Sequence, residues 1–338
     1  MSKFSITRRS AMKIGLGGIA MPFAVTGAIA APKVTLRMAS GLPADMNSSH
    51  YVWFDRFQSN LKTAVGDAIA INYFPNGQLG KEGDMVQQVR LGAVDMMVSG
   101  VSYWASLVPE YGVLDLGYLF NDENHVARAL DGKAGSALAD LLLKKTAIHT
   151  LGYAHSLGAR NVYTSKPIAK PEDLHGVKIR VLPVPNFIAT LKAMGSVPIP
   201  LPLGELYTAL QTGVVDGLEQ DAPTVLSSKF YEVAKYCTLT RHIYNPIVAV
   251  MGKRAMDRVP AEYHDALRKA AQEASIYQRG LATATEAKAF EQLKSNGLQV
   301  AEIDREYFRK ALQPVWESFS SQYPDTKAII ADVQAVAA

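Results

Sequence analysis

Short apolar runs alternate with longer amphipathic runs through most of this chain, and that alternation predicts an α/β fold. Residues 34–38, 68–74 and 94–98 have the length and composition of strands, and helical patterns at 49–61 and 84–91 lie between them. These five segments form a βαβαβ unit. In a unit of this kind a ligand binds at the carboxyl ends of the strands.

A second α/β unit is expected in the following part of the chain. It contains a strand at 177–181, a helix at 186–194, an extended proline-rich connector at 198–202 and a short helix at 205–212. The chain has 338 residues, which is more than one compact core usually organises. We therefore predict two α/β lobes.

The longest helical pattern, residues 261–294, lacks proline and has one internal glycine, Gly280. A helix of this length would span about 50 Å, more than a small domain. We expect it to cross both lobes and to bend at Gly280, and the alternative is a plain surface helix. Another helix is expected at 124–145, and strands are expected at 147–153 and 247–251.

The first 31 residues have the features of an export signal and are left out of the fold prediction. Arg8 and Arg9 form a twin-arginine pair, followed by an apolar run and by a small-x-small sequence at 28–30. The alternative is a transmembrane anchor, but the run is short for one and is broken by glycine and proline. We expect residues 1–31 to be a twin-arginine signal peptide and the mature protein to lie in the periplasm.

Charge and cysteine content exclude several classes of protein. Four of the 35 basic residues and none of the 31 acidic residues lie in the first 31 positions, so the rest of the chain is electrically neutral. A neutral body lacks the basic surface that nucleic-acid binding requires. The single cysteine, Cys237, has no partner for an intrachain disulfide, and we expect it to pack as a small buried group.

Signatures of catalysis are scarce in this sequence. It contains no His-Glu-x-x-His, no Gly-x-Ser-x-Gly, no phosphate-binding loop and no paired cysteine motif. Its seven histidines are scattered without ligand-like spacing, so no metal site and no cofactor is expected. A Ser-His-Asp set assembled only in space stays open, because such triads are recognised by geometry.

Two long segments carry a specific resemblance. Residues 171–181 read Pro-Glu-Asp-Leu-His-Gly-Val-Lys-Ile-Arg-Val, and residues 210–217 read Leu-Gln-Thr-Gly-Val-Val-Asp-Gly. They resemble the solute receptors of tripartite ATP-independent periplasmic (TRAP) transporters, in the subfamily that binds dicarboxylates and related organic acids. Residues 73–80 and 230–236 are similar to further segments of that family, so the likeness extends over nearly the whole mature chain.

The resemblance implies a periplasmic-binding-protein-like Venus flytrap, in which two α/β lobes close on a ligand. Crossover strands and one long helix join the lobes. The expected division is 32–157 plus 246–285 for lobe I and 158–245 plus 286–338 for lobe II, with the helix at 261–294 in both. The expected partners are a small organic acid and the small and large permease subunits, and the expected state is a monomer.

The same resemblance assigns the central ligand contact to Arg180, because the family places an arginine at this point of the Lys-Ile-Arg-Val string. A guanidinium is permanently charged and offers parallel donors that match a carboxylate. Arg160 fits the family's second arginine, with an inter-lobe salt bridge as the alternative role. Gln220 stands where many members have asparagine, and its longer amide would hold a hydroxyl or carboxylate oxygen.

Further candidates surround these three. Leu203 lies where several relatives have an aromatic wall, and Gly100 lacks the acid of sialic-acid-type receptors, which argues against an amino-sugar acid. For several candidates ligand contact competes with packing or with a solvated helix start: His50, Glu82, Tyr103, Trp104, Tyr244 and Asn245. The expected ligand is a mono- or dicarboxylate with a hydroxyl or oxo group. A secreted α/β hydrolase and a sensory receptor are the alternative functions.

Overall fold

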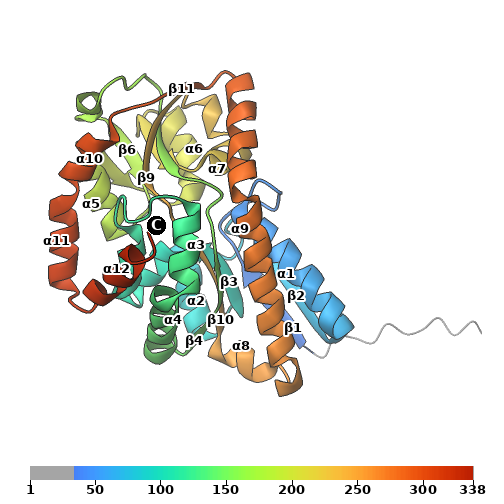
Figure 1. The fold of residues 1–338 in the computed structure, drawn as a ribbon. Helices are drawn as coiled ribbons and strands as arrows, with labels where there is room; N and C mark the ends of the chain where they lie inside the picture. Colours follow the sequence, from blue (N-terminus) through green and yellow to red (C-terminus); the bar gives the residue numbers. More distant parts are fainter. Residues whose placement is uncertain (1–33, 338) are drawn as a thin grey trace, which may run out of the picture. The chain divides into compact units, whose positions relative to one another are not determined.

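The computed structural model describes residues 34–337, which form two β-sheets flanked by helices (Figure 1). The predicted signal peptide lies outside these residues. Within 34–337, no helix combines the length and the apolar character needed to cross a bilayer. The prediction of a mixed α/β fold is confirmed.

The first sheet has five strands in the order β2-β1-β3-β10-β4. They are β2 (Ile69–Phe74), β1 (Val34–Ala39), β3 (Met96–Gly100), β10 (Ile247–Gly252) and β4 (Ile148–Ala154). Strands β1, β2 and β3 run parallel, as predicted, while β10 is antiparallel to both of its neighbours. The carboxyl ends of the three parallel strands therefore share one edge.

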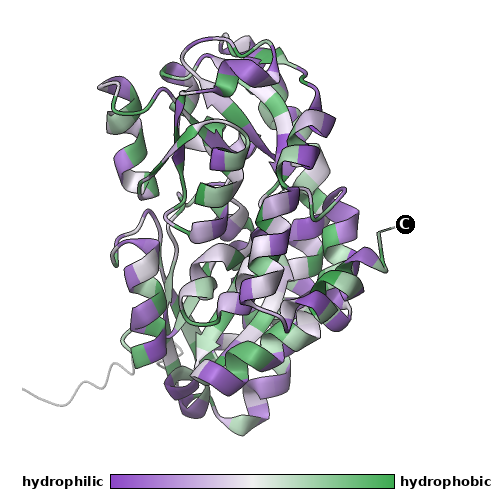
Figure 2. Ribbon diagram, turned by 90° about the vertical axis from the view of Figure 1, so that its left-hand side faces the viewer, coloured by the Kyte–Doolittle hydropathy of each residue, from purple (hydrophilic) through white to green (hydrophobic). Residues whose placement is uncertain are grey.

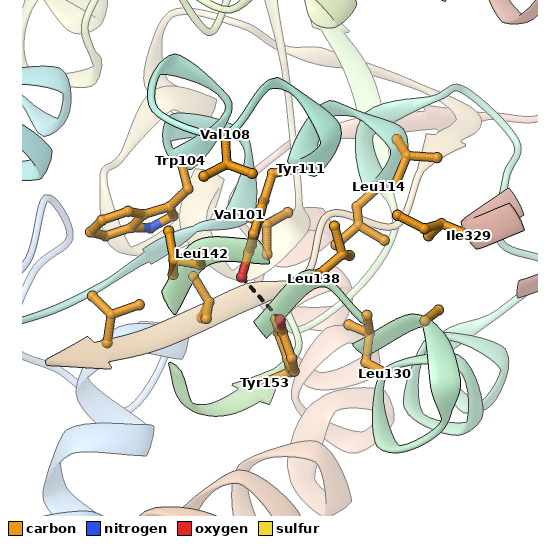
Figure 3. Close-up of a cluster of buried hydrophobic side chains, with 14 of the residues drawn as sticks. Val101, Trp104, Val108, Tyr111, Leu114, Leu130, Leu138, Leu142, Tyr153 and Ile329 are labelled. Carbon is orange, nitrogen blue, oxygen red and sulfur yellow. Dashed lines mark hydrogen bonds between the residues drawn. The ribbon is translucent and has the colours of Figure 1, made fainter. Parts of the chain in front are cut away.

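Both faces of this sheet are covered by helices. Alternate residues of β10 enter different cores: Val248 and Val250 face one cluster, and Ala249 and Met251 face the other. The helix α1 (Ser49–Val65), capped by Ser48, belongs to the second of these clusters. Figure 3 shows part of the first cluster, in which the hydroxyls of Tyr111 and Tyr153 lie 3.1 Å apart. Hydrophilic and hydrophobic residues are interspersed along the helices, as expected of helices that pack one apolar face against a core (Figure 2).

The second sheet has six strands in the order β11-β9-β5-β8-β6-β7. They are β11 (Gln299–Ala301), β9 (Tyr236–Ile243), β5 (Arg160–Thr164), β8 (Gly217–Gln220), β6 (Lys178–Val181) and β7 (Val197–Pro200). The proline-rich connector expected at 198–202 is partly a strand, since β7 pairs in parallel with β6. An edge strand tolerates proline because one of its sides needs no ladder donors.

The other helices connect and cover these sheets. Apart from α1 and the long helix α9, which is described below, they are α2 (Glu82–Leu91), α3 (Glu123–Asp131), α4 (Lys133–Thr146), α5 (Pro185–Ala193), α6 (Leu203–Gln211), α7 (Ala222–Ser227), α8 (Lys253–Arg258), α10 (Arg305–Ala311), α11 (Gln313–Gln322) and α12 (Thr326–Gln334). Short 3-10 turns lie at Gly66–Ala68, Val101–Ser106, Pro109–Asp115, Pro171–Leu174, Phe230–Glu232 and Ala261–Tyr263.

The prediction of a single helix at 124–145 is wrong, because the chain forms two helices there, α3 and α4. Gly132 has an extended backbone between them, with φ −98° and ψ −153°. The next turn brings Gly135 against the carbonyl of Leu130, so closely that a Cβ at this position would collide with it. The break therefore depends on a close backbone approach that periodicity does not reveal.

The helix α9 (His264–Ser295) runs beside both sheets (Figure 1) and contributes to the cores of both. Its first half packs Leu267 and Ala271 into a cluster of the five-stranded sheet, and its second half packs Ala289 and Leu293 into a cluster of the six-stranded sheet. The predicted lobe boundaries stay a prediction. They assign the C-terminal segment to lobe II, whereas α12 packs Ile329 into a cluster of the five-stranded sheet.

Candidate functional site

A cavity of about 50 Å³ lies where the carboxyl end of β3 faces residues from β5, β6 and β8. Both sheets contribute to its wall. The lining residues are Leu42, Ser49, His50, Glu82, Gly100, Tyr103, Ser156, Arg160, Arg180, Leu182, Leu203, Gln220, Asp221, Thr224, Asn245 and Ile247. Eight of the ten side chains proposed from the sequence are among them. Their contact with a ligand remains a prediction.

The two exceptions are Trp104 and Tyr244. Trp104 is fully buried in a core cluster of the five-stranded sheet, and its Nε1 donates to Ser99 Oγ at 2.9 Å. Tyr244 packs against the same cluster. Tyr103 and Trp104 lie in a 3-10 turn, where successive residues are rotated by about 120°. Tyr103 therefore reaches the cavity while its neighbour enters the core.

Arg180 approaches the cavity from β6 and is only 1% exposed. Its Nε donates to the carbonyl of Leu201 at 2.8 Å. Its terminal nitrogens Nη1 and Nη2 are buried, and neither makes a hydrogen bond to another residue of the segment 34–337. Burial lowers the pKa of this guanidinium, but an arginine keeps its charge in proteins. A buried and unpaired charge is costly, so this geometry calls for an anion.

Arg160 also lines the cavity, but a neighbouring strand already holds it. Its Nε donates to Glu219 Oε2 at 2.5 Å, and its Nη2 donates to Glu219 Oε1 at 2.9 Å and to the Glu219 carbonyl at 3.0 Å. Three of the five guanidinium donors are thereby used, and the remaining two are on Nη1. Both residues lie in the six-stranded sheet, so this ion pair is not the inter-lobe bridge considered from the sequence.

Glu219 is fully buried, and burial by itself would raise the pKa of its carboxyl group. Arg160 and His242 outweigh that effect and hold the pKa below its usual value. His242 Nε2 lies 3.5 Å from Glu219 Oε2, and burial lowers the pKa of this imidazole. Glu219 was missed as a functional residue. Its signal was a charged residue next to Gln220 in a short strand that is completely buried, where a charge requires a partner.

The two amides at the cavity have defined orientations. Gln220 Oε1 accepts from the backbone N–H of Asp221 at 3.1 Å, which leaves its NH2 group as the donor for a solute. Asn245 has the opposite arrangement, because its Nδ2 donates to Ser102 Oγ at 2.9 Å and to Asp115 Oδ1 at 3.0 Å. The side of the cavity near Gln220 thus offers N–H groups, and the side near Asn245 offers an oxygen.

The five-stranded sheet contributes His50 and Glu82. His50 Nδ1 and Ser40 Oγ form a 2.9 Å hydrogen bond, and burial lowers the pKa of His50 to about 3, so its ring is neutral. Glu82 begins α2 and is only 8% exposed, which excludes a solvated helix start. Its carboxyl group lies against Gly41, where a Cβ would collide with it. Burial raises the pKa of Glu82, and the charge of Arg180 opposes that shift.

Asp221 and Thr224 were not predicted. Asp221 Oδ1 accepts from Thr224 N at 2.9 Å and caps α7, and burial raises the pKa of Asp221 to about 6. An Asp-x-Pro-Thr sequence directly after a strand is a helix-start signature and could have revealed this corner. Among residues 34–337, no group of three or more His, Cys, Asp or Glu side chains is placed to hold a metal ion.

A larger groove of about 600 Å³ adjoins the cavity and shares Glu82 and Leu203 with it. Across this groove Lys81 Nζ donates to Glu205 Oε1 at 2.7 Å. Lys81 precedes α2 beside the five-stranded sheet, and Glu205 lies in α6 beside the six-stranded sheet. The ion pair therefore connects the two sides at the groove that adjoins the cavity.

The chain is similar to proteins of known role. The family model for bacterial extracellular solute-binding proteins, family 7, matches residues 43–322. The 2,3-diketo-L-gulonate-binding periplasmic protein YiaO of Escherichia coli (strain K12) is 36% identical over 274 residues, which cover 80% of this chain and 83% of that protein.

Solved structures of TRAP periplasmic solute-binding proteins have the same fold. One from Citrobacter koseri, with bound D-glucuronate, is 34% identical with a TM-score of 0.83, covering 88% of this chain and 99% of that one. One from Polaromonas sp. JS666, bound to D-erythronate, is 32% identical with a TM-score of 0.85, covering 90% and 99%. These relatives are binding proteins, so the hydrolase alternative is not favoured. The chain belongs to family 7 of the bacterial extracellular solute-binding proteins, the receptors that bind organic acids for TRAP transporters.

Proposed function

We propose that this receptor binds a sugar acid with a single carboxylate in the cavity between its lobes. The observation that carries the proposal is the buried, unpaired end of Arg180. Two parallel N–H groups on Nη1 and Nη2 match the two oxygens of a carboxylate, and the resulting ion pair would satisfy both nitrogens.

The charges around the cavity favour one carboxylate over two. Glu219 already neutralises Arg160, which leaves Arg180 as the cation available to a ligand. Glu82 lies in the same wall and would repel a second carboxylate. A dicarboxylate would bring more negative charge into this closed space than the described lining compensates.

The other polar groups suit a ligand with several hydroxyls. Gln220 Nε2 and Arg160 Nη1 are donors, while Asn245 Oδ1 and the Glu82 carboxylate are acceptors. A hydroxyl group can both donate and accept, so hydroxyls can meet either kind of partner. The relatives named for 2,3-diketo-L-gulonate, D-glucuronate and D-erythronate support this ligand class.

Closure of the lobes completes the proposed cycle. The bound acid stabilises the closed form by its higher affinity for that form, and the ion pair of Lys81 with Glu205 forms across the mouth. The loaded receptor, a monomer exported by the twin-arginine route, then passes the acid to the small and large permease subunits. No catalytic step is part of this function.

A thermal-shift and calorimetric screen of the mature protein tests the proposal. The probes are D-glucuronate, D-galacturonate, D-gluconate and D-erythronate, with the dicarboxylate D-glucarate for comparison. A ligand at about 100 times its dissociation constant stabilises the folded state by about 2.7 kcal/mol. We expect a shift with at least one monocarboxylate and a weaker one with glucarate.

Two arginine variants identify the anchor. Arg180→Ala should abolish the shift with every acid. Arg279→Ala is the matched control, because Arg279 also pairs with a carboxylate, that of Asp131 at 2.7 and 2.9 Å, but lines a different cavity. Binding that survives in Arg180→Ala, or a preference for glucarate, would contradict the proposal.

A further inference from the structure

The side chain of Asn245 offers a solute its oxygen and not its nitrogen. Asn245 is 4% exposed and lines the cavity. Its NH2 group has two hydrogens, and both are used, in the bonds to Ser102 Oγ and Asp115 Oδ1. The remaining polar atom of the side chain is Oδ1, which can only accept a hydrogen bond.

Two buried neighbours fix this orientation. Ser102 Oγ donates its own hydrogen to Asp115 Oδ1 at 2.7 Å, so toward Asn245 both Ser102 and Asp115 act as acceptors. A reversed amide would place its oxygen against two acceptors and would lose both hydrogen bonds. Ser102 and Asp115 are almost completely buried, so losing those bonds would leave buried polar groups without partners, which is costly.

Gly100 leaves room for this oxygen at the cavity wall. A Cβ on Gly100 would lie 3.0 Å from Asn245 Oδ1 and 4.0 Å from Cδ2 of Tyr103. Gly100 and Tyr103 both line the cavity, so Oδ1 lies beside two of its wall residues. The acceptor is therefore both oriented and placed beside the space that a solute would fill.

We propose that Asn245, oriented by Asp115 and Ser102, is a specificity-determining acceptor that selects a hydroxyl over an oxo group on the carbon of the bound acid that faces it. This inference rests on the proposed function, since it needs a sugar acid in the cavity. A hydroxyl donates its hydrogen to Oδ1. A carbonyl oxygen at the same carbon has no hydrogen to give and meets Oδ1 as a second acceptor.

Sites that hydrogen-bond a hydroxyl reject analogues that lack it more strongly than apolar pockets reject a change in size. We expect the keto acid in which the carbon facing Asn245 is oxidised to bind more weakly, with a dissociation constant at least 10-fold larger than that of the hydroxy acid. Titration calorimetry of the mature protein measures the dissociation constants of D-gluconate and of its 2-keto, 3-keto and 5-keto analogues. It also compares the pair D-glycerate and hydroxypyruvate.

Three variants separate the role of Asn245 from general effects. Asn245→Leu removes the acceptor and should weaken binding of the hydroxy acid about 10-fold or more while abolishing the preference. Asp115→Asn replaces an acceptor by an amide, which can either accept from or donate to Asn245. Asn245 can then turn its NH2 group toward the solute, so this variant should bind the rejected keto acid more tightly than the wild type does. Asn186→Leu is the matched control, because Asn186 donates to the Gly112 carbonyl at 2.6 Å but does not line the solute cavity.

The outcomes are distinct. A preference for the hydroxy acid that is lost in Asn245→Leu, reduced in Asp115→Asn and kept in Asn186→Leu supports the inference. Equal binding of hydroxy and keto acids by the wild type, or a preference that survives in Asn245→Leu, overturns it while the proposed function stands. A protein that binds no sugar acid in either screen overturns both. The keto-acid affinity of Asp115→Asn decides the matter if Asn245→Leu does not fold.

Discussion

Two arginines at one cavity have different electrostatic situations. Arg160 is neutralised by Glu219 from the neighbouring strand, whereas the end of Arg180 has no partner within 34–337. The first pair is fully buried, and its carboxylate also lies near His242. The pair therefore belongs to the structure of the site, and Arg180 is the residue that a ligand would complete.

The buried pair of Arg160 and Glu219 should be sensitive to loss of one partner. Glu219→Gln leaves the Arg160 charge buried without compensation, and we expect the free energy of unfolding to fall by about 3–5 kcal/mol. Asp131→Asn is the control. The side chain of Asp131 is largely exposed in its ion pair with Arg279, so this substitution should lower the free energy of unfolding by about 1 kcal/mol or less. Urea denaturation of both variants measures the difference. Equal losses would contradict the distinction.

Asp115 should make stability depend on pH. Burial raises the pKa of Asp115 from 3.8 to about 7 in the folded protein. Between these values the unfolded chain has lost the proton and the folded chain has kept it. The free energy of unfolding therefore falls as pH rises through this window, by at most about 1.4 kcal/mol per pH unit for this group, and the contribution levels off above about pH 7.

The comparison of wild type with Asp115→Asn isolates that contribution. Buried histidines such as His50 and His155, whose pKa values are lowered to about 3, act in the opposite direction below about pH 6.5, but they are present in both proteins. We expect the wild type to lose stability relative to the variant as pH rises from about 4.5 to 7. A difference that is independent of pH would show that Asp115 does not titrate in this range.

At the scale of elements, periodicity predicted the five strands of the first sheet, β6 of the second sheet and the long helix, because each has a repeated apolar face, but it did not predict β5, β9 or β11. It failed where a single close approach decides the structure, as at Gly135, and where edge pairing turns a proline-rich segment into β7. Arg180 was found through the resemblance of a local string. Glu219 was missed, because its partner Arg160 lies 59 residues away and only the folded sheet brings them together.

Two helical glycines should respond in opposite ways to alanine. At Gly135 a Cβ would collide with the carbonyl of Leu130, so Gly135→Ala should destabilise the protein by more than about 1 kcal/mol. At Gly280, in the middle of α9, a Cβ would have nothing within 4 Å. Gly280→Ala should therefore stabilise the protein by about 0.5–1 kcal/mol. Thermal melts compare the two, and a stabilised Gly135→Ala would refute the close approach.

At the scale of the molecule, the solute cavity is built from both sheets, so its geometry exists only when the two sides are together. Arg180, Arg160 and Gln220 come from the six-stranded sheet, while His50 and Glu82 come from elements beside the five-stranded sheet. Sequence patterns predicted the lobes separately. The pairing across them depended on the resemblance to a known family, because no local pattern encodes which strand ends will face each other.

The helix α9 packs against the cores of both sheets, and this has a consequence for how the protein unfolds. Each half of α9 packs apolar side chains into a different core. If one half of the helix unfolds, the other half loses its continuous helical support, and its own core is destabilised. The lobes should then melt as a single cooperative unit, with one calorimetric transition whose van't Hoff and calorimetric enthalpies agree. Two resolved transitions in the wild type would mean that the lobes are thermodynamically independent. A receptor that unfolds as one unit can hinge without either lobe passing through a separately melted state.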